Sequence, residues 1–136
     1  MAKYELASAE SKAYLSDEQW SSIVASLSGN IASRAKHDRN QYRRFVEAVL
    51  WVAVNRAFWS ELPARYGSRR LVYIRYVRWC EADTWSKVEG ALGPRDLGAL
   101  LGLLLVKQRD EQRKRKRRRE RRSSMVADDQ AANQTR

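Results

Sequence analysis

The chain has 136 residues and carries 27 Lys and Arg against 16 Asp and Glu, a formal net charge of +11 at pH 7. A chain of this length can bury one hydrophobic core, which excludes a multidomain protein. A single cysteine excludes an intrachain disulfide, and the longest apolar run, residues 97–106, is about half of the ~20 residues that a membrane-spanning helix needs. Residues 1–14 have no apolar stretch typical of a signal peptide, so we expect a cytoplasmic, nucleoid-associated protein that does not bind membranes.

The positive charge is concentrated in two blocks. Residues 34–80 contain eleven Lys and Arg against three acids, and residues 107–122 contain the same numbers. The first block is interspersed with Trp, Tyr, Val and Leu at helical spacing, which predicts a folded basic surface. The second block includes the run RKRKRRRERR, which is typical of a solvated segment that binds polyanions without choosing among them.

The first predicted helix begins after Ser16. Ser16 and Gln19 have the spacing of a capping box, and Leu15 and Trp20 have that of a hydrophobic staple. Gly29-Asn30 is expected to end this helix. We therefore expect a flexible arm before it, at residues 1–14, and a polar connector after it, at residues 28–37.

A second helix is expected from Asp38 to about Asn55. Asp38 and Gln41 repeat the capping-box spacing at its start. Its apolar stripe is expected in the core, whereas three charged residues are expected to face outward. The stripe contains Tyr42, Phe45, Val46, Val49, Val52 and Ala53, and the outward residues are Arg43, Arg44 and Glu47.

A short helix, a glycine turn and a longer helix are predicted next. Ser60 is placed to cap the short helix, Gly67 to end it, and Ser68 to cap the longer helix at residues 69–82. This is the layout of a helix-turn-helix. In that motif the N-terminal end of the second helix, here Arg69 and Arg70, is presented to the major groove of DNA.

The helix at 69–82 is predicted to have a packing face and an outward face. At 100° per residue, Val72, Tyr73, Tyr76, Trp79 and Cys80 gather on the packing side. Leu71, Arg75, Arg78 and Ala82 gather on the opposite side. The alternative interpretation is a solvated helix that happens to be rich in arginine.

The last predicted elements differ sharply in character. A fourth helix is expected from Asp83-Thr84 to Gly93-Pro94, with Trp85, Val88 and Leu92 inward. Residues 93–106 are rich in Leu and Gly and are interpreted as a docking or self-association segment. Residues 107–136 are interpreted as a basic, largely disordered tail, although the two segments could form one helix. The tryptophans assigned mainly to the core are Trp20, Trp51, Trp59, Trp79 and Trp85.

The residue types needed for common catalytic or metal sites are scarce. His37 is the only histidine and Cys80 the only cysteine, so one chain cannot assemble a Cys/His zinc site. No Walker-type glycine loop is present. Several acids stand near predicted helix starts, where they favourably oppose the helix dipole. We therefore expect no metal, no cofactor and no catalytic centre.

An ordered series of motifs carries a resemblance to a known group of proteins. The motifs are LSDEQW at 15–20, EAVLWV at 47–52, WSELPARYG at 59–67 and VYIRYVRW at 72–79, followed by Trp85. In their order and spacing they resemble the N-terminal DNA-binding region of bacterial insertion-element transposases, over residues 15–92. Two departures stand out. Arg56-Ala57-Phe58-Trp59 replaces a Thr-Gly-Ala-Pro-Trp type of turn, and Ile74 and Val77 stand where the family commonly has polar or basic residues.

The resemblance implies an all-α fold: a small helical bundle that contains a helix-turn-helix at 15–92, with a basic C-terminal helical or disordered tail. It implies double-stranded DNA as the partner and the terminal inverted repeats of an element as the target. Full-length members continue into an RNase-H-like domain with a DDE carboxylate triad, for which the 44 residues after Leu92 are too few. We expect a first reading frame or a truncated form without catalytic activity.

The candidate DNA contacts fall into three groups. Base edges or groove-lining phosphates are assigned to Arg69, Arg70, Arg75 and Arg78, with Arg75 and Arg78 the better candidates for base contacts. Flanking phosphates are assigned to Arg43, Arg44 and Arg65. Salt-sensitive, sequence-independent contacts are assigned to the tail, including Arg113, Lys114, Arg115, Lys116 and Arg117.

Two alternative functions remain open. In one, Leu97–Val106 pairs with a second copy or with a full-length transposase, and the chain acts as an inhibitor. In the other, the basic tail coats nucleic acid without sequence preference and the helix-turn-helix has no role.

Overall fold

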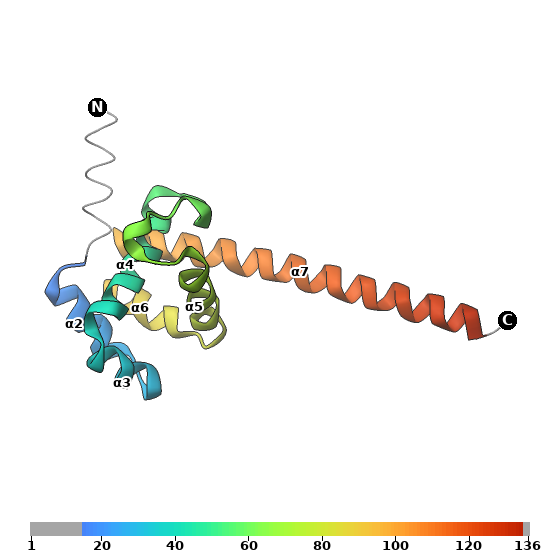
Figure 1. The fold of residues 1–136 in the computed structure, drawn as a ribbon, viewed down its shortest axis with the longest axis horizontal. Helices are drawn as coiled ribbons and strands as arrows, with labels where there is room; N and C mark the ends of the chain where they lie inside the picture. Colours follow the sequence, from blue (N-terminus) through green and yellow to red (C-terminus); the bar gives the residue numbers. More distant parts are fainter. Residues whose placement is uncertain (1–14, 135–136) are drawn as a thin grey trace, which may run out of the picture. The chain divides into compact units, whose positions relative to one another are not determined.

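The computed structural model describes residues 15–134, and all regular structure within them is helical, as the sequence predicted (Figure 1). The predicted arm at 1–14 lies outside the described residues. The chain divides into two compact units, residues 1–104 and residues 105–136. The helical elements in chain order are α2 (Asp17–Ser26), α3 (Gly29–His37), α4 (Arg39–Asn55), the 3-10 turns η1 (Trp59–Glu61) and η2 (Ala64–Tyr66), α5 (Arg69–Glu81), α6 (Thr84–Leu92) and α7 (Leu97–Gln134).

Helix α2 begins with the predicted capping box. The Gln19 backbone N–H donates to Ser16 Oγ at 3.1 Å, and the Ser16 N–H donates to Gln19 Oε1 at 2.9 Å. These bonds satisfy two of the backbone donors that a helix start leaves without a partner. The buried residues Trp20 and Ile23 belong to the face of α2, which packs mainly against α6.

Helix α3 occupies the segment that was predicted to be a polar connector, so that prediction is wrong. Gly29 does not end structure here but starts the new helix, with a φ of +63° that glycine adopts without strain. Ala35 is fully buried, and α3 packs against α4. A nine-residue helix with few apolar residues is stabilised mainly by such tertiary packing, which its own sequence does not reveal.

Asp38 connects α3 to α4 without the predicted side-chain cap. Its φ and ψ of −128° and 61° lie outside the extended region that N-caps favour, and its side chain makes no capping hydrogen bond. Its backbone N–H closes α3 instead by donating to the Arg34 carbonyl oxygen at 2.9 Å. The capping box predicted for Asp38 and Gln41 is therefore wrong, although α4 begins where expected.

An aromatic cluster joins α4, α5 and α6 in the core. The rings of Phe45 and Trp79 meet edge to face with centroids 5.0 Å apart, and Trp79 and Trp85 are also 5.0 Å apart. Trp85 is buried, and its indole N–H donates to the Tyr76 carbonyl oxygen at 3.0 Å. The predicted core role is confirmed for Trp20, Trp79 and Trp85, whereas Trp51 and Trp59 lie half-buried at the edge.

Two 3-10 turns replace the predicted short helix between α4 and α5. Pro63 separates them, and Leu62 before it is extended, with φ −56° and ψ 126°. A residue before proline disfavours the α conformation, because the proline ring clashes with it, so one continuous helix is interrupted here. Gly67 ends η2 with a φ of +89°, and Ser68 Oγ accepts from the Leu71 N–H at 3.3 Å, as the sequence predicted.

Helix α7 continues through the segment that was predicted to be largely disordered. Residues 107–134 are helical, with no Gly or Pro after Gly102 to interrupt them. Arg, Lys, Glu and Gln are good helix formers, which accounts for helix where the charge pattern suggested disorder. None of the helices in residues 15–134 is long and apolar enough to cross a membrane.

Candidate nucleic-acid interface

The N-terminal end of α5 presents two exposed arginines. Arg69 and Arg70 follow the Ser68 cap directly, and both are exposed. Arg69 Nε also donates to the Leu62 carbonyl oxygen at 2.8 Å, which holds the end of η1 against the start of α5. The positive end of the helix dipole lies at the same place, so this end of α5 favours anions.

The two faces of α5 are partly as predicted. Val72, Tyr76 and Trp79 are buried, and Arg78 is exposed. Arg75, however, does not point outward: its guanidinium carbon lies 4.9 Å from the Tyr42 ring centroid. It also lies 5.3 Å from the ring centroid of Phe45, so the cation stacks against two aromatic rings of α4.

The outward orientation predicted for Arg75 is therefore wrong. The periodicity of α5 gives its angular faces but not where the neighbouring helix lies. Because α4 packs against this side of α5, its rings are within reach of Arg75.

Arg43 is also turned inward, contrary to prediction. Its Nη1 donates to Asp17 Oδ1 at 2.7 Å, its Nε donates to Glu47 Oε1 at 3.3 Å, and its Nη2 donates to the Leu15 carbonyl oxygen. The hydrogen bond to Asp17 raises the pKa of Arg43 above its ordinary value, although partial burial opposes the rise. Glu47, predicted to face outward, is buried and accepts the Leu15 N–H at 3.1 Å.

The result is a polar clamp, formed by Leu15, Asp17, Arg43 and Glu47, that fixes the start of α2 to α4. Arg43 already uses Nε, Nη1 and Nη2 within the clamp. The three arginines that the sequence assigned to flanking phosphates therefore differ, because Arg43 is engaged within the protein and the other two are exposed. Arg44 on α4 and Arg65 in η2 are exposed, and the Arg65 guanidinium lies 4.9 Å from the Tyr66 ring.

Three exposed cations were not among the predicted DNA contacts: two stand in the segment interpreted as a connector, and the third stands at the start of the predicted second helix. Arg34 and Lys36 stand in the last turn of α3, and Arg39 begins α4. All three belong to the positive block at 34–80, and this block was the sequence feature that could have identified them. They add exposed positive charge to the first unit on α3 and at the start of α4.

The segment interpreted as a docking segment, Leu97–Val106, contributes to the core. Leu97 and Leu101 are buried, whereas Leu103 and Val106 are exposed. Leu97 and Leu101 are therefore not available for pairing with another chain, whereas Leu103 and Val106 are.

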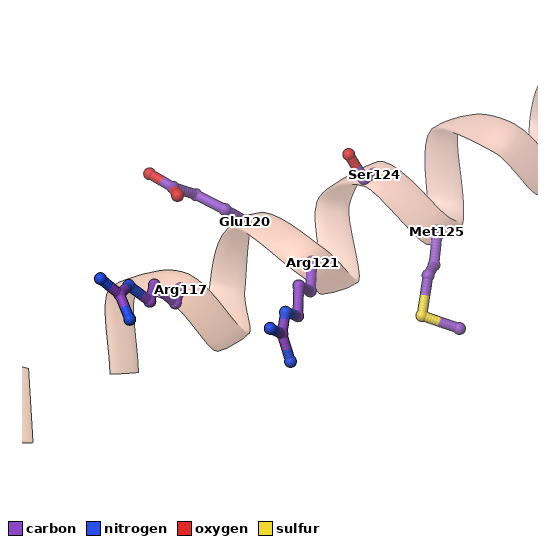
Figure 2. A pocket seen from close by; sticks show the side chains of 5 residues that line it. All are labelled: Arg117, Glu120, Arg121, Ser124 and Met125. Carbon is purple, nitrogen blue, oxygen red and sulfur yellow. The ribbon is translucent and has the colours of Figure 1, made fainter. Parts of the chain in front are cut away.

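From residue 113 onwards, α7 is exposed on all sides. Residues 113–117 are all exposed, and they follow one another around the helix. A shallow hollow farther along is lined by five side chains from successive turns of α7 alone (Figure 2). These are Arg117, Glu120, Arg121, Ser124 and Met125. A surface of this kind suits a flexible polyanion better than a small ligand, which needs an enclosing pocket.

No three His, Cys, Asp or Glu side chains between residues 15 and 134 are grouped so that they could hold a metal ion. What residues 15–134 do present is a helical surface with many exposed cationic side chains.

Comparison with known proteins identifies the family. The family model described as "Putative transposase of IS4/5 family" matches residues 15–89, more than half of the chain. The chain belongs to this family. The resemblance that the motifs predicted is thereby confirmed.

Membership of the IS4/5 transposase family covers α2 through most of α6. It therefore includes all four arginines of α5, whereas α7 lies beyond the matched residues.

A relative in Sinorhizobium fredii (strain NBRC 101917 / NGR234) carries the name "Uncharacterized protein y4sN" and is 37% identical over 67 residues. The match covers 49% of this chain and 53% of the relative, so the chain spans about half the length of that curated relative. No solved structure matches the chain.

Proposed function

We propose that this chain is the DNA-binding part of an IS4/5-type transposase, that it recognises the terminal inverted repeats of its element, and that it carries out no cleavage by itself. The observation that carries the proposal is the capped N-terminus of α5, where Arg69 and Arg70 are exposed within the family-matched region. The Gly67 turn before α5 supports the helix-turn-helix layout, although 3-10 turns precede it.

The proposal gives different tasks to the arginines of the first unit. Arg70 and Arg78 are exposed on α5 and would contact base edges, where a bidentate contact to guanine is worth about 1–3 kcal/mol of discrimination. Arg69 would contact phosphate at the helix start. Arg75 and Arg43 would position α5 and α2 against α4, since their guanidinium groups are stacked or hydrogen-bonded there.

The test compares two duplexes with the full chain. One duplex carries a terminal repeat of the element that encodes the protein, and the other carries the same bases in scrambled order. Arg70→Ala combined with Arg78→Ala should remove most of the preference for the repeat in a fluorescence anisotropy titration.

A matched control removes the same charge from α7. Arg121→Ala combined with Arg122→Ala should weaken binding to both duplexes by the same factor, because phosphate contacts carry no sequence information. Failure of the unmodified chain to prefer the repeat would overturn the proposal. An equal loss on both duplexes from the α5 variant would reduce Arg70 and Arg78 to phosphate contacts.

Sequence-independent coating of nucleic acid is a second candidate, favoured by the exposure of the cations on α7. It predicts that the α7 variant lowers affinity strongly and that the α5 variant has little effect. The same titrations therefore separate the two candidates.

A further inference from the structure

Leu71 is an exposed leucine in the first turn of α5. Its side chain is 66% exposed, while Val72 beside it is buried. It stands immediately after Arg69 and Arg70, at the end of the helix that the proposed function directs towards DNA. An aliphatic side chain between arginines at this position has no role in the core of the unit.

Leu71 belongs to a strip that contains both apolar and cationic side chains. Ile74 and Arg78 follow it at i+3 and i+7, which places the three side chains along one side of the helix. Arg70 flanks the strip, four residues before Ile74. Ile74 is partly exposed and Arg78 is exposed.

The chemistry of this strip matches the major groove of DNA. The groove edge of guanine offers two acceptors to an arginine, and thymine offers the C5-methyl group, an apolar feature that aliphatic side chains contact. The surrounding cations favour a phosphate-lined partner. A protein partner that covered Leu71 would have to bury Arg70 and Arg78 beside it without their phosphate counterions.

We propose that Leu71 is a specificity-determining residue that contacts the C5-methyl group of a thymine in the terminal repeat, between base contacts made by Arg70 and Arg78. This inference rests on the proposed function, because it requires α5 to enter the major groove of the repeat.

The experiment removes the methyl group from the DNA and the leucine from the protein. The thymines of the repeat duplex are replaced by uracil one at a time, which removes only the C5-methyl group. At one or two positions the replacement should weaken binding of the full chain by about four-fold, the factor expected for one methyl-sized apolar contact. Leu71→Ala should bind the thymine duplex correspondingly less tightly and should no longer distinguish thymine from uracil at those positions.

Leu103→Ala is the matched control, since Leu103 is also an exposed leucine, at 60%. It should keep the full discrimination between thymine and uracil. Unchanged discrimination in Leu71→Ala, or none in the unmodified chain despite a preference for the repeat, would overturn the role of Leu71 and leave the proposed function intact. No preference for the repeat at all would overturn the proposed function itself.

Discussion

The two units carry equal blocks of positive charge, but the charged side chains are arranged differently in each. In the first unit, packing fixes individual arginines: Arg43 is hydrogen-bonded in the polar clamp, Arg69 holds the η1 end, and Arg75 stacks on α4. In the second unit, residues 113–117 are exposed around a single helix. Net charge is equal in the two blocks, but packing decides which arginines are exposed and which hold the fold together.

The largest expected effect is on the aromatic core of the first unit. Trp85→Ala removes a buried indole that contacts Phe45, Tyr76 and Trp79, and it should lower the free energy of unfolding by about 4 kcal/mol. Near-ultraviolet circular dichroism during urea unfolding reports on this unit, because all five tryptophans lie within it. Met125→Ala, at a side chain 67% exposed on α7, should change stability by less than about 0.5 kcal/mol. Equal effects of the two substitutions would contradict the contrast between the units.

The next effect tests the close approach at the start of α7. A Cβ atom at Gly98 would overlap the Gly93 carbonyl oxygen, a backbone atom that cannot move aside easily. Gly98→Ala should therefore cost about 3 kcal/mol of unfolding free energy. At Gly102 a Cβ meets only the flexible Glu89 carboxylate at 3.0 Å, so Gly102→Ala should be neutral or stabilising, given the helix propensity of alanine. Thermal unfolding of the two variants measures this difference, and equal midpoint temperatures would refute the predicted clash at Gly98.

The polar clamp should show an intermediate effect. Glu47→Ala leaves the Leu15 N–H and the Arg43 guanidinium without this acceptor, which should cost about 2 kcal/mol in urea unfolding. Glu47→Gln keeps an acceptor oxygen and should recover part of the loss. Glu120→Ala on the exposed part of α7 is the control and should fall within about 0.5 kcal/mol of the unmodified chain. An equally small cost for Glu47→Ala would show that the clamp is not needed for stability.

Replacing an arginine by glycine should stabilise the first unit at one position and destabilise helix α7 at another. Arg56 ends α4 with a φ of +48°, a left-handed conformation that costs a non-glycine residue roughly 1 kcal/mol. Arg56→Gly should therefore stabilise the first unit by about 1 kcal/mol. Arg113→Gly lies inside α7 and should reduce its helicity, because glycine is about 1 kcal/mol less favourable than alanine in a helix interior. Circular dichroism at 222 nm measures the second effect, and thermal unfolding measures the first. Stabilisation by both substitutions, or by neither, would contradict this prediction.

The smallest expected effect on stability belongs to the exposed arginines of the second unit. Arg117→Ala combined with Arg121→Ala should leave the unfolding free energy within about 0.5 kcal/mol. If both arginines contact phosphates, the slope of log affinity against log salt should fall by roughly 2. Titrations at several salt concentrations measure that slope. An unchanged slope would mean that this part of α7 does not touch the DNA backbone.

Local chemistry explains which elements the sequence predicts well. The capping box at Ser16 and Gln19, the glycine turn at Gly67 and the cap at Ser68 depend on residues within a few positions of one another, so sequence is sufficient for them. The interruption at Pro63 is equally local, and the preference of the residue before proline could have predicted it. The helix at 29–37 was missed because its stability comes from α4 rather than from its own residues.

By itself, the sequence determined an all-α chain that resembles insertion-element transposases, with two positive blocks and a capped, arginine-rich helix predicted at 69–82. Only the tertiary structure decided the tasks of the arginines. Periodicity assigned Arg43 and Arg75 to outward faces, but each has a buried partner on α4: Arg43 is hydrogen-bonded to Glu47, and Arg75 stacks on Tyr42. The physical reason is that a long arginine side chain binds whichever carboxylate, carbonyl group or aromatic ring lies within its reach. The packing of segments distant in sequence determines which of these groups is near.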